Sequence, residues 1–239
     1  MIICGAPRSG TTLLWQLMAG SVTNVKVDTK RERKRLDQEF DEKGNPLIIK
    51  GPHLLMLRPD KPIILIRDPR DVLTSMMDGK YFCHLTRCEG ARIGKDHGVT
   101  QFAMAAQRYI THNRIGLIVP YESLIRDPDY WQIRCSQFWG LEYSRLWHEY
   151  PDNWADLSRW RRKLNGIRPI GQQVHTWKDH LPRIADCVAE QPGMLQEVLE
   201  LLGYEEDDSW QEILEGRQHQ TEARGAMVSV SVGGTELEV

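Results

Sequence analysis

Residues 5–12 read Gly5-Ala6-Pro7-Arg8-Ser9-Gly10-Thr11-Thr12, and they stand between an apolar run, Met1 to Cys4, and a helical pattern, Thr11 to Ala19. The apolar side chains of that pattern share one helix face. A glycine loop between a strand and a helix directs successive backbone N–H groups and the positive helix end toward one point. The stretch therefore predicts an anion-binding loop at the end of a strand.

The loop resembles a phosphate loop but departs from it in one position. The spacing from Gly5 to Gly10 matches that of a Walker A loop, yet Thr11 stands where the lysine would be, and Arg8 is the only cation of the loop. An ATPase or a kinase uses that lysine with magnesium to stabilise a γ-phosphoryl group. A loop without that lysine fits a transferred group of lower charge. A sulfuryl group carries one charge fewer than a γ-phosphoryl group, so one arginine and backbone donors can stabilise it without a metal ion. An ordinary glycine turn with a surface arginine is the alternative.

Strands and helices alternate along the chain. We expect further strands at Pro46 to Lys50, Lys61 to Ile66 and Ile115 to Val119, and helices from Pro69 to about Met77, at Val99 to His112 and at Pro192 to Gly203. Asp68 and Pro69 supply an N-cap and a first-turn proline. The pattern predicts a three-layer α/β/α fold around a central parallel sheet, P-loop-like, with a mostly helical C-terminal part. Ligands are expected at the carboxyl ends of the strands.

Size and composition favour one domain. The chain has 239 residues and a net charge of −2, so we expect a single domain at 1–216, a tail at 217–239, and no general attraction for nucleic acid or an anionic membrane. The first residues read as a strand rather than as a signal peptide, and no apolar run approaches the roughly 20 residues of a membrane span. The five cysteines are scattered, which favours reduced thiols in a cytoplasmic protein.

A second motif begins where the third expected strand ends. Arg67 is followed eight residues later by Ser75, in Arg-Asp-Pro-Arg-Asp-Val-Leu-Thr-Ser. An arginine offers a planar fork for a phosphate dianion, and a serine adds a hydroxyl donor. Together with the first motif, this pattern resembles the 3′-phosphoadenosine 5′-phosphosulfate (PAPS)-dependent sulfotransferases. In that family a loop like Pro7 to Thr12 grips the 5′-phosphosulfate, and an arginine and a serine grip the 3′-phosphate.

The resemblance implies further cofactor residues. Val-Pro-Tyr-Glu-Ser-Leu, at 119–124, is similar to the segment whose tyrosine lies against the adenine, so Tyr121 is a candidate and Glu122 a brace for its loop. A buried structural role for Tyr121 is the alternative. The family closes a late basic loop over the 3′-phosphate, and Arg159, Arg161, Arg162 and Lys163 form the only dense late cluster, with Arg161 as our choice. A solvated helix face is the alternative.

Three groups compete for the role of catalytic base. His53, in Lys50-Gly51-Pro52-His53, resembles the family's Lys-Thr-His segment in a register one residue longer; Asp28 and Glu32 are acidic alternatives. The charged stretch from Lys26 to Lys43 suggests an anionic acceptor, such as an acidic glycan, or simply an exposed salt-bridged helix. Cys83, His84, Cys88 and His97 fit no common zinc spacing, so no metal site is predicted.

The sequence thus predicts an enzyme that transfers a sulfuryl group from PAPS to a hydroxyl or amine acceptor, with Arg8 stabilising the leaving phosphate. A P-loop nucleotide kinase or NTPase is the first alternative, and a nucleotide-binding protein without catalytic activity is the second.

Overall fold

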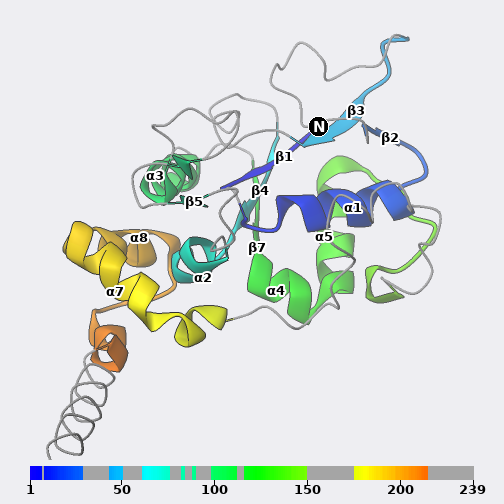
Figure 1. The fold of residues 1–239 in the computed structure, drawn as a ribbon. Coiled ribbons are helices and arrows are strands. Elements are labelled where there is room, and N and C mark those ends of the chain that lie inside the picture. Colours follow the sequence, from blue (N-terminus) through cyan, green and yellow to red (C-terminus); the bar gives the residue numbers. More distant parts are fainter. Residues whose placement is uncertain are drawn as a thin grey trace, which may run out of the picture.

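The structure is a computed structural model, and it describes residues 1–6, 8–28, 43–50, 61–75, 82–83, 88–89, 98–111, 116–149 and 175–214. Five of its strands form one parallel sheet in the order β2-β3-β1-β4-β7 (Figure 1). The strands are β1 (Ile2–Gly5), β2 (Lys26–Val27), β3 (Leu47–Lys50), β4 (Ile63–Ile66) and β7 (Leu117–Pro120). The four predicted strands are confirmed within one or two residues. The strand β2 was missed because two residues are too few to show a period.

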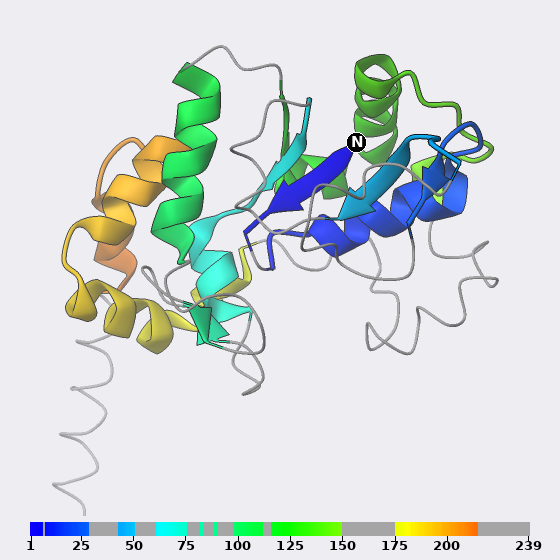
Figure 2. The same ribbon diagram turned by 90° about the horizontal axis from the view of Figure 1, so that it is seen from above.

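Helices cover both faces of the sheet, because successive strand residues point to opposite sides. On one face, Ile3, Ile48, Leu65 and Val119 share a core with α1 (Thr11–Ser21) and α5 (Pro128–Trp139). On the other face a second set of strand residues packs against Ala106 of α3 (Val99–Thr111), and it comprises Ile2, Cys4, Ile49, Ile64 and Ile66. The sheet therefore lies between two helical layers (Figure 2), and the predicted three-layer α/β/α fold is confirmed.

Two short helices begin within three residues of a strand end. The helix α2 (Pro69–Thr74) begins after the N-cap Asp68, whose side chain accepts a hydrogen bond from the Arg70 N–H, with a proline in the first turn as predicted. It ends earlier than expected, because Ser75 is its C-cap; residues 76 and 77 lie outside the described residues. The helix α4 (Tyr121–Arg126) follows β7 without a loop, and α5 follows after the N-cap Asp127.

We call residues 175–214 the C-terminal helical unit. It contains α7 (Leu181–Glu190), α8 (Met194–Leu202) and the 3₁₀ helices η5 (Thr176–Asp179) and η6 (Ser209–Gln211). The predicted glycine cap is confirmed, since Gly203 ends α8 with a φ of +74°. The unit shares a buried core with α2 and α3.

A buried arginine fastens the C-terminal helical unit to α2. The Arg70 guanidinium forms a bidentate pair with Asp68 and an ion pair of 2.6 Å with Glu205, and it lies 4.2 Å from the ring centroid of Trp177. A second indole, that of Trp210, lies 5.1 Å from the same guanidinium. Stacking and paired carboxylates together offset the cost of burying this charge.

The remaining described elements are the 3₁₀ helix η3 (Trp147–Glu149) and an antiparallel pair, β5 (Phe82–Cys83) with β6 (Cys88–Glu89). Cys83 and Cys88 are register partners, while His84 and His97 lie outside the described residues. Among the described residues, no group of three or more metal-ligating side chains occurs. Within that same part of the chain, no helix combines the length and apolar character that crossing a bilayer requires.

Candidate functional site

The carboxyl ends of all five parallel strands meet at one edge of the sheet, and the predicted site residues that the structure describes lie in the segments that follow these ends. Asp28 follows β2, the glycine loop follows β1, Arg67 follows β4, and Tyr121 follows β7. The chain leaves β1 toward β2 on one side and leaves β4 toward β7 on the other. A switch point of this kind, between β1 and β4, is where open α/β sheets bind ligands.

The glycine loop has a backbone that only particular residues tolerate. Gly10 has a φ of +95°, and a Cβ there would lie 2.2 Å from Cδ2 of Tyr121, so only glycine fits. Arg8 has a φ of +67°, which is unfavourable for a residue with a side chain. Ser9 is buried, and its hydroxyl and its N–H both bond to the Ala6 carbonyl. Ser9 therefore shapes the turn, while Arg8 is exposed at its surface.

The start of α1 is open to an anion. The first bond within the helix runs from the Leu14 N–H to the Gly10 carbonyl, so the N–H groups of Thr11, Thr12 and Leu13 have no acceptor within α1. No acidic residue occupies this first turn, and no side chain caps it. The aligned peptide dipoles give this end a partial positive charge. These donors fit a phosphate or sulfate group.

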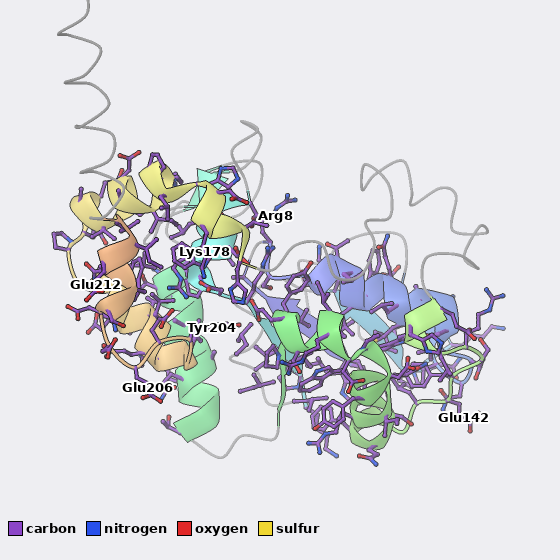
Figure 3. The ribbon with its side chains drawn as sticks, turned by 90° about the horizontal axis from the view of Figure 1, so that it is seen from below. Arg8, Glu142, Lys178, Tyr204, Glu206 and Glu212 are labelled. Atoms are coloured by element: carbon purple, nitrogen blue, oxygen red, sulfur yellow. The ribbon has the colours of Figure 1, made fainter. Side chains whose placement is uncertain are left out.

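The two predicted anion-binding motifs contact each other. Arg67 Nη1 donates to the Arg8 carbonyl oxygen over 3.1 Å, and Arg8 Nη2 donates to the Ser75 carbonyl oxygen over 3.0 Å. Arg8 lies where the sheet layer meets the C-terminal helical unit (Figure 3). The sequence predicted that these motifs lie on adjacent strand ends, and the structure brings them into direct contact.

Arg67 is more enclosed than the sequence suggested. Only 6% of the residue is exposed, its guanidinium lies 4.6 Å from the ring centroid of Tyr121, and its Nη2 lies 3.5 Å from the Asp71 carboxylate. Held by these contacts, Arg67 is positioned to stabilise the backbone of Arg8, which lies in the left-handed region. Ser75 lies at the end of α2, and its hydroxyl donates to the Val72 carbonyl oxygen over 3.1 Å. That hydroxyl must rotate before it can donate to a ligand.

Tyr121 is buried, with 6% of its surface exposed, between Gly10 and Arg67. This is the structural role that the sequence left open, and the adenine contact stays a prediction. Its neighbour Glu122 accepts from the Asp68 N–H over 2.9 Å and from the Tyr204 hydroxyl over 2.8 Å. Glu122 thus braces the loop after β4, and burial raises the pKa of its carboxyl group.

Lys50 is a site residue to which the sequence analysis gave no role. It ends β3, and its Nζ donates to Thr12 Oγ1 over 2.8 Å. A cation from a neighbouring strand thus reaches the first turn of α1, near where a Walker A loop has its own lysine. The signal in the sequence was a lysine that closes a buried apolar strand, a position where a charge needs a local reason.

Among the three base candidates, Asp28 alone is described. It is buried, and its N–H donates to the Ile48 carbonyl oxygen over 2.8 Å at the carboxyl end of β2. Val27 pairs with Ile48, so Asp28 is placed beside the last residues of β3, close to Lys50 in the register. Outside the described residues lie Pro7, Glu32, His53, and the cluster Arg159, Arg161, Arg162 and Lys163.

Comparisons with known proteins add no family to this description. No family model matches the chain, and no curated protein matches it. The functional argument therefore depends on the residues themselves and on how the fold arranges them.

Proposed function

We propose that the chain is a sulfotransferase that uses PAPS as donor and a hydroxyl or amine compound as acceptor. We further propose that it works in the cytoplasm and without a metal ion. One observation carries the proposal: the open first turn of α1, next to Arg8, adjoins the Arg67 to Ser75 segment at the switch point of a parallel sheet. Two adjoining anion-binding motifs suit a nucleotide that is phosphorylated at both its 5′ and its 3′ position.

The donor set supports this choice. Arg8, Lys50 and the N–H groups of the first turn of α1 are all hydrogen-bond donors, and the first turn contains no acid. When bound, PAPS supplies the sulfuryl group and a phosphate as leaving group. Arg8 and the N–H groups of Gly10 to Thr12 then hold the 5′-phosphate and stabilise the negative charge that develops on it.

The acceptor must lose a proton as its oxygen or nitrogen bonds to sulfur and the bond from sulfur to the phosphate oxygen breaks. Asp28, His53 and Glu32 are the candidates for the base that takes this proton. Asp28 lies at the same edge of the sheet as the loop, after β2 and two strands away from β1. The acceptor approaches from the side opposite the leaving phosphate, because the transfer is in line.

Lys50 favours a second candidate function. Since its ammonium group reaches Thr12, the site has a lysine beside the phosphate loop after all, as a nucleotide kinase or NTPase requires. A nucleotide-binding protein without catalytic activity would show the same contacts. The three functions differ in the ligand they bind and in whether transfer follows.

Thermal unfolding with 3′-phosphoadenosine 5′-phosphate, compared with ATP and magnesium, tests the proposal. A ligand at a hundred times its Kd stabilises the fold by about 2.7 kcal/mol. For a chain of this size, the expected rise in Tm is roughly 5–10 °C. We expect this rise with the bisphosphate, a smaller rise with magnesium ATP, and little rise for Arg8→Ala with either ligand.

Arg134→Ala is the matched control, because Arg134 is an exposed arginine on α5, away from the loop. It should respond to the bisphosphate as the unaltered protein does. A larger shift with magnesium ATP would favour the kinase or NTPase. Transfer of labelled sulfur from PAPS to members of an acceptor panel then separates the enzyme from a binding protein.

A further inference from the structure

Asp71 is the most enclosed charged residue beside the candidate site, with 0% of its surface exposed. Its carboxylate accepts hydrogen bonds from the His175 N–H over 2.9 Å, the Trp177 N–H over 2.9 Å and the Thr176 hydroxyl over 3.1 Å. The same carboxylate lies 3.5 Å from Arg67 Nη2. Asp71 thus joins an arginine of the candidate nucleotide site to residues that follow it by more than a hundred positions.

These contacts belong to a closed ring around α2. Arg67 bonds to the Arg8 carbonyl, Arg8 bonds to the Ser75 carbonyl, and the Ser75 N–H bonds to the Asp71 carbonyl over 3.0 Å. The Asp71 carboxylate closes the ring at Arg67. Within this ring the Arg67 guanidinium is held from two sides, by a carboxylate and by a carbonyl oxygen.

The backbone on the far side of Asp71 is held in an unfavourable conformation. His175 has a φ of +61°, and its N–H is one of the groups bonded to Asp71. A residue with a side chain adopts this region only where its surroundings enforce it, and such residues cluster at binding sites. Asp71 therefore fixes two unfavourable features together: a buried guanidinium and a left-handed histidine.

We propose that Asp71 is a positioning residue for the nucleotide site: it fixes Arg67 for the 3′-phosphate and couples nucleotide binding to the docking of residues 175–177 on α2. This inference rests on the proposed function. A side chain that is already immobilised loses less conformational entropy when a ligand binds. Because of reciprocity, an anion at Arg67 that depends on this arrangement must in turn stabilise the segment that Asp71 holds.

Asp71→Asn separates a positioning role from simple charge neutralisation, because the two roles predict opposite changes in nucleotide affinity. If Asp71 only neutralised Arg67, removing its charge would make the site more positive and would tighten nucleotide binding. A positioning role predicts the opposite, because the N–H₂ of asparagine accepts no hydrogen bond. In one amide orientation the contacts of Arg67 and of the His175 N–H are lost, and in the other the bond from the Trp177 N–H is lost. We expect the affinity for 3′-phosphoadenosine 5′-phosphate to fall by about tenfold, because the Arg67 side chain would then have to be immobilised when the ligand binds.

The readout is the ratio of affinities for 3′-phosphoadenosine 5′-phosphate and adenosine 5′-phosphate, because it isolates the contribution of the 3′-phosphate. Glu205→Gln is the matched control: it makes the same change of carboxylate to amide at the same interface, but at the partner of Arg70. Asp71→Asn should reduce the ratio, and Glu205→Gln should preserve it. If Asp71→Asn does not fold, Thr176→Ala replaces it in the test. This variant removes one contact to Asp71 and should reduce the ratio by a smaller factor.

Hydrogen exchange at residues 175–185 provides the second measurement. In the unaltered protein, the bisphosphate should slow exchange of these amides, and in Asp71→Asn at saturating ligand this protection should be lost. An unaltered protein that does not distinguish the two nucleotides contradicts the proposed function and this inference with it. A protein that distinguishes them equally well after Asp71→Asn, or that loses the ratio equally in Glu205→Gln, overturns the inference alone.

Discussion

Replacing Arg8 by glycine and by alanine separates what its backbone costs from what its side chain does. Both variants lose the side chain and its hydrogen bond to the Ser75 carbonyl, so that loss cancels in a comparison of the two. They differ at the backbone, because Arg8 has a φ of +67°. A residue with a Cβ pays about 1–2 kcal/mol for this conformation. Glycine avoids that penalty. Its unfolded chain has more conformational entropy, however, and this lowers the stability of the fold by about 0.4–1 kcal/mol.

Taking the middle of each range, about 1.5 and about 0.7 kcal/mol, Arg8→Gly should be more stable than Arg8→Ala by roughly 0.8 kcal/mol. For a chain of this size, this corresponds to a Tm higher by about 1–4 °C. Thermal and urea unfolding without ligand measure the difference. Both variants should gain little stability from 3′-phosphoadenosine 5′-phosphate, because the exposed guanidinium is missing from both.

A pair of variants in an ordinary helix controls for the general difference between glycine and alanine. Asp186 is exposed on α7, where the backbone is helical. Asp186→Gly should there be less stable than Asp186→Ala by up to about 1 kcal/mol, the opposite order. If Arg8→Ala is as stable as Arg8→Gly or more stable, residue 8 does not have the left-handed backbone conformation described above. If either Arg8 variant binds the bisphosphate normally, the proposed role of the side chain is wrong.

Three further predictions concern the glycine loop, the carboxyl group of Glu122 and the buried thiols. Gly10→Ala should abolish bisphosphate binding and lower the Tm, since its Cβ would meet the Tyr121 ring; normal binding by titration calorimetry would contradict this. Burial raises the pKa of Glu122 in the folded state, so the native protein holds the proton that the unfolded chain has lost. Its contribution to stability is therefore present below the ordinary pKa and lost as the pH rises through the folded pKa. Denaturant unfolding, measured from below the ordinary carboxyl pKa to above the folded-state pKa, should show a free energy of unfolding that depends less on pH in Glu122→Gln than in the unaltered protein. Parallel curves for the two proteins would refute this prediction. Burial also raises the thiol pKa of Cys4, Cys135 and Cys187. In a Cys83→Ser, Cys88→Ser background, a thiol reagent should therefore label the chain only at the rate of unfolding, and rapid labelling of the native protein would show that these thiols are accessible.

Much of the fold could be predicted from local patterns. An unbroken apolar run predicted β4, and all four of its residues are buried, with β1 on one side of the strand and β7 on the other. Asp68 and Pro69 predicted the start of α2, and Gly203 predicted the end of α8, because capping depends on a few neighbouring residues. The end of α2 was set too late, since nothing near Ser75 in the sequence marks a stop.

The candidate site was predictable only in part. Glycine spacing located the loop, and the position of Arg67 after an apolar strand located the second motif. That Tyr121 would be buried against Gly10 could not be predicted, because its ring approaches a residue that lies far away in the sequence and on another strand end. The same holds for Lys50, whose contact with Thr12 depends on β3 lying next to β1.

By itself, the sequence determined the elements, their caps and the residue types of the two anion-binding motifs, because these depend on short-range geometry and on side-chain chemistry. The tertiary structure alone decided that Arg67 braces Arg8, that Lys50 reaches the loop, and that Asp71 holds residues 175–177. Each of these contacts joins segments that become neighbours only when parallel strands align and helices pack across them. Local patterns carry no information about such a neighbourhood, since packing of the whole core selects it.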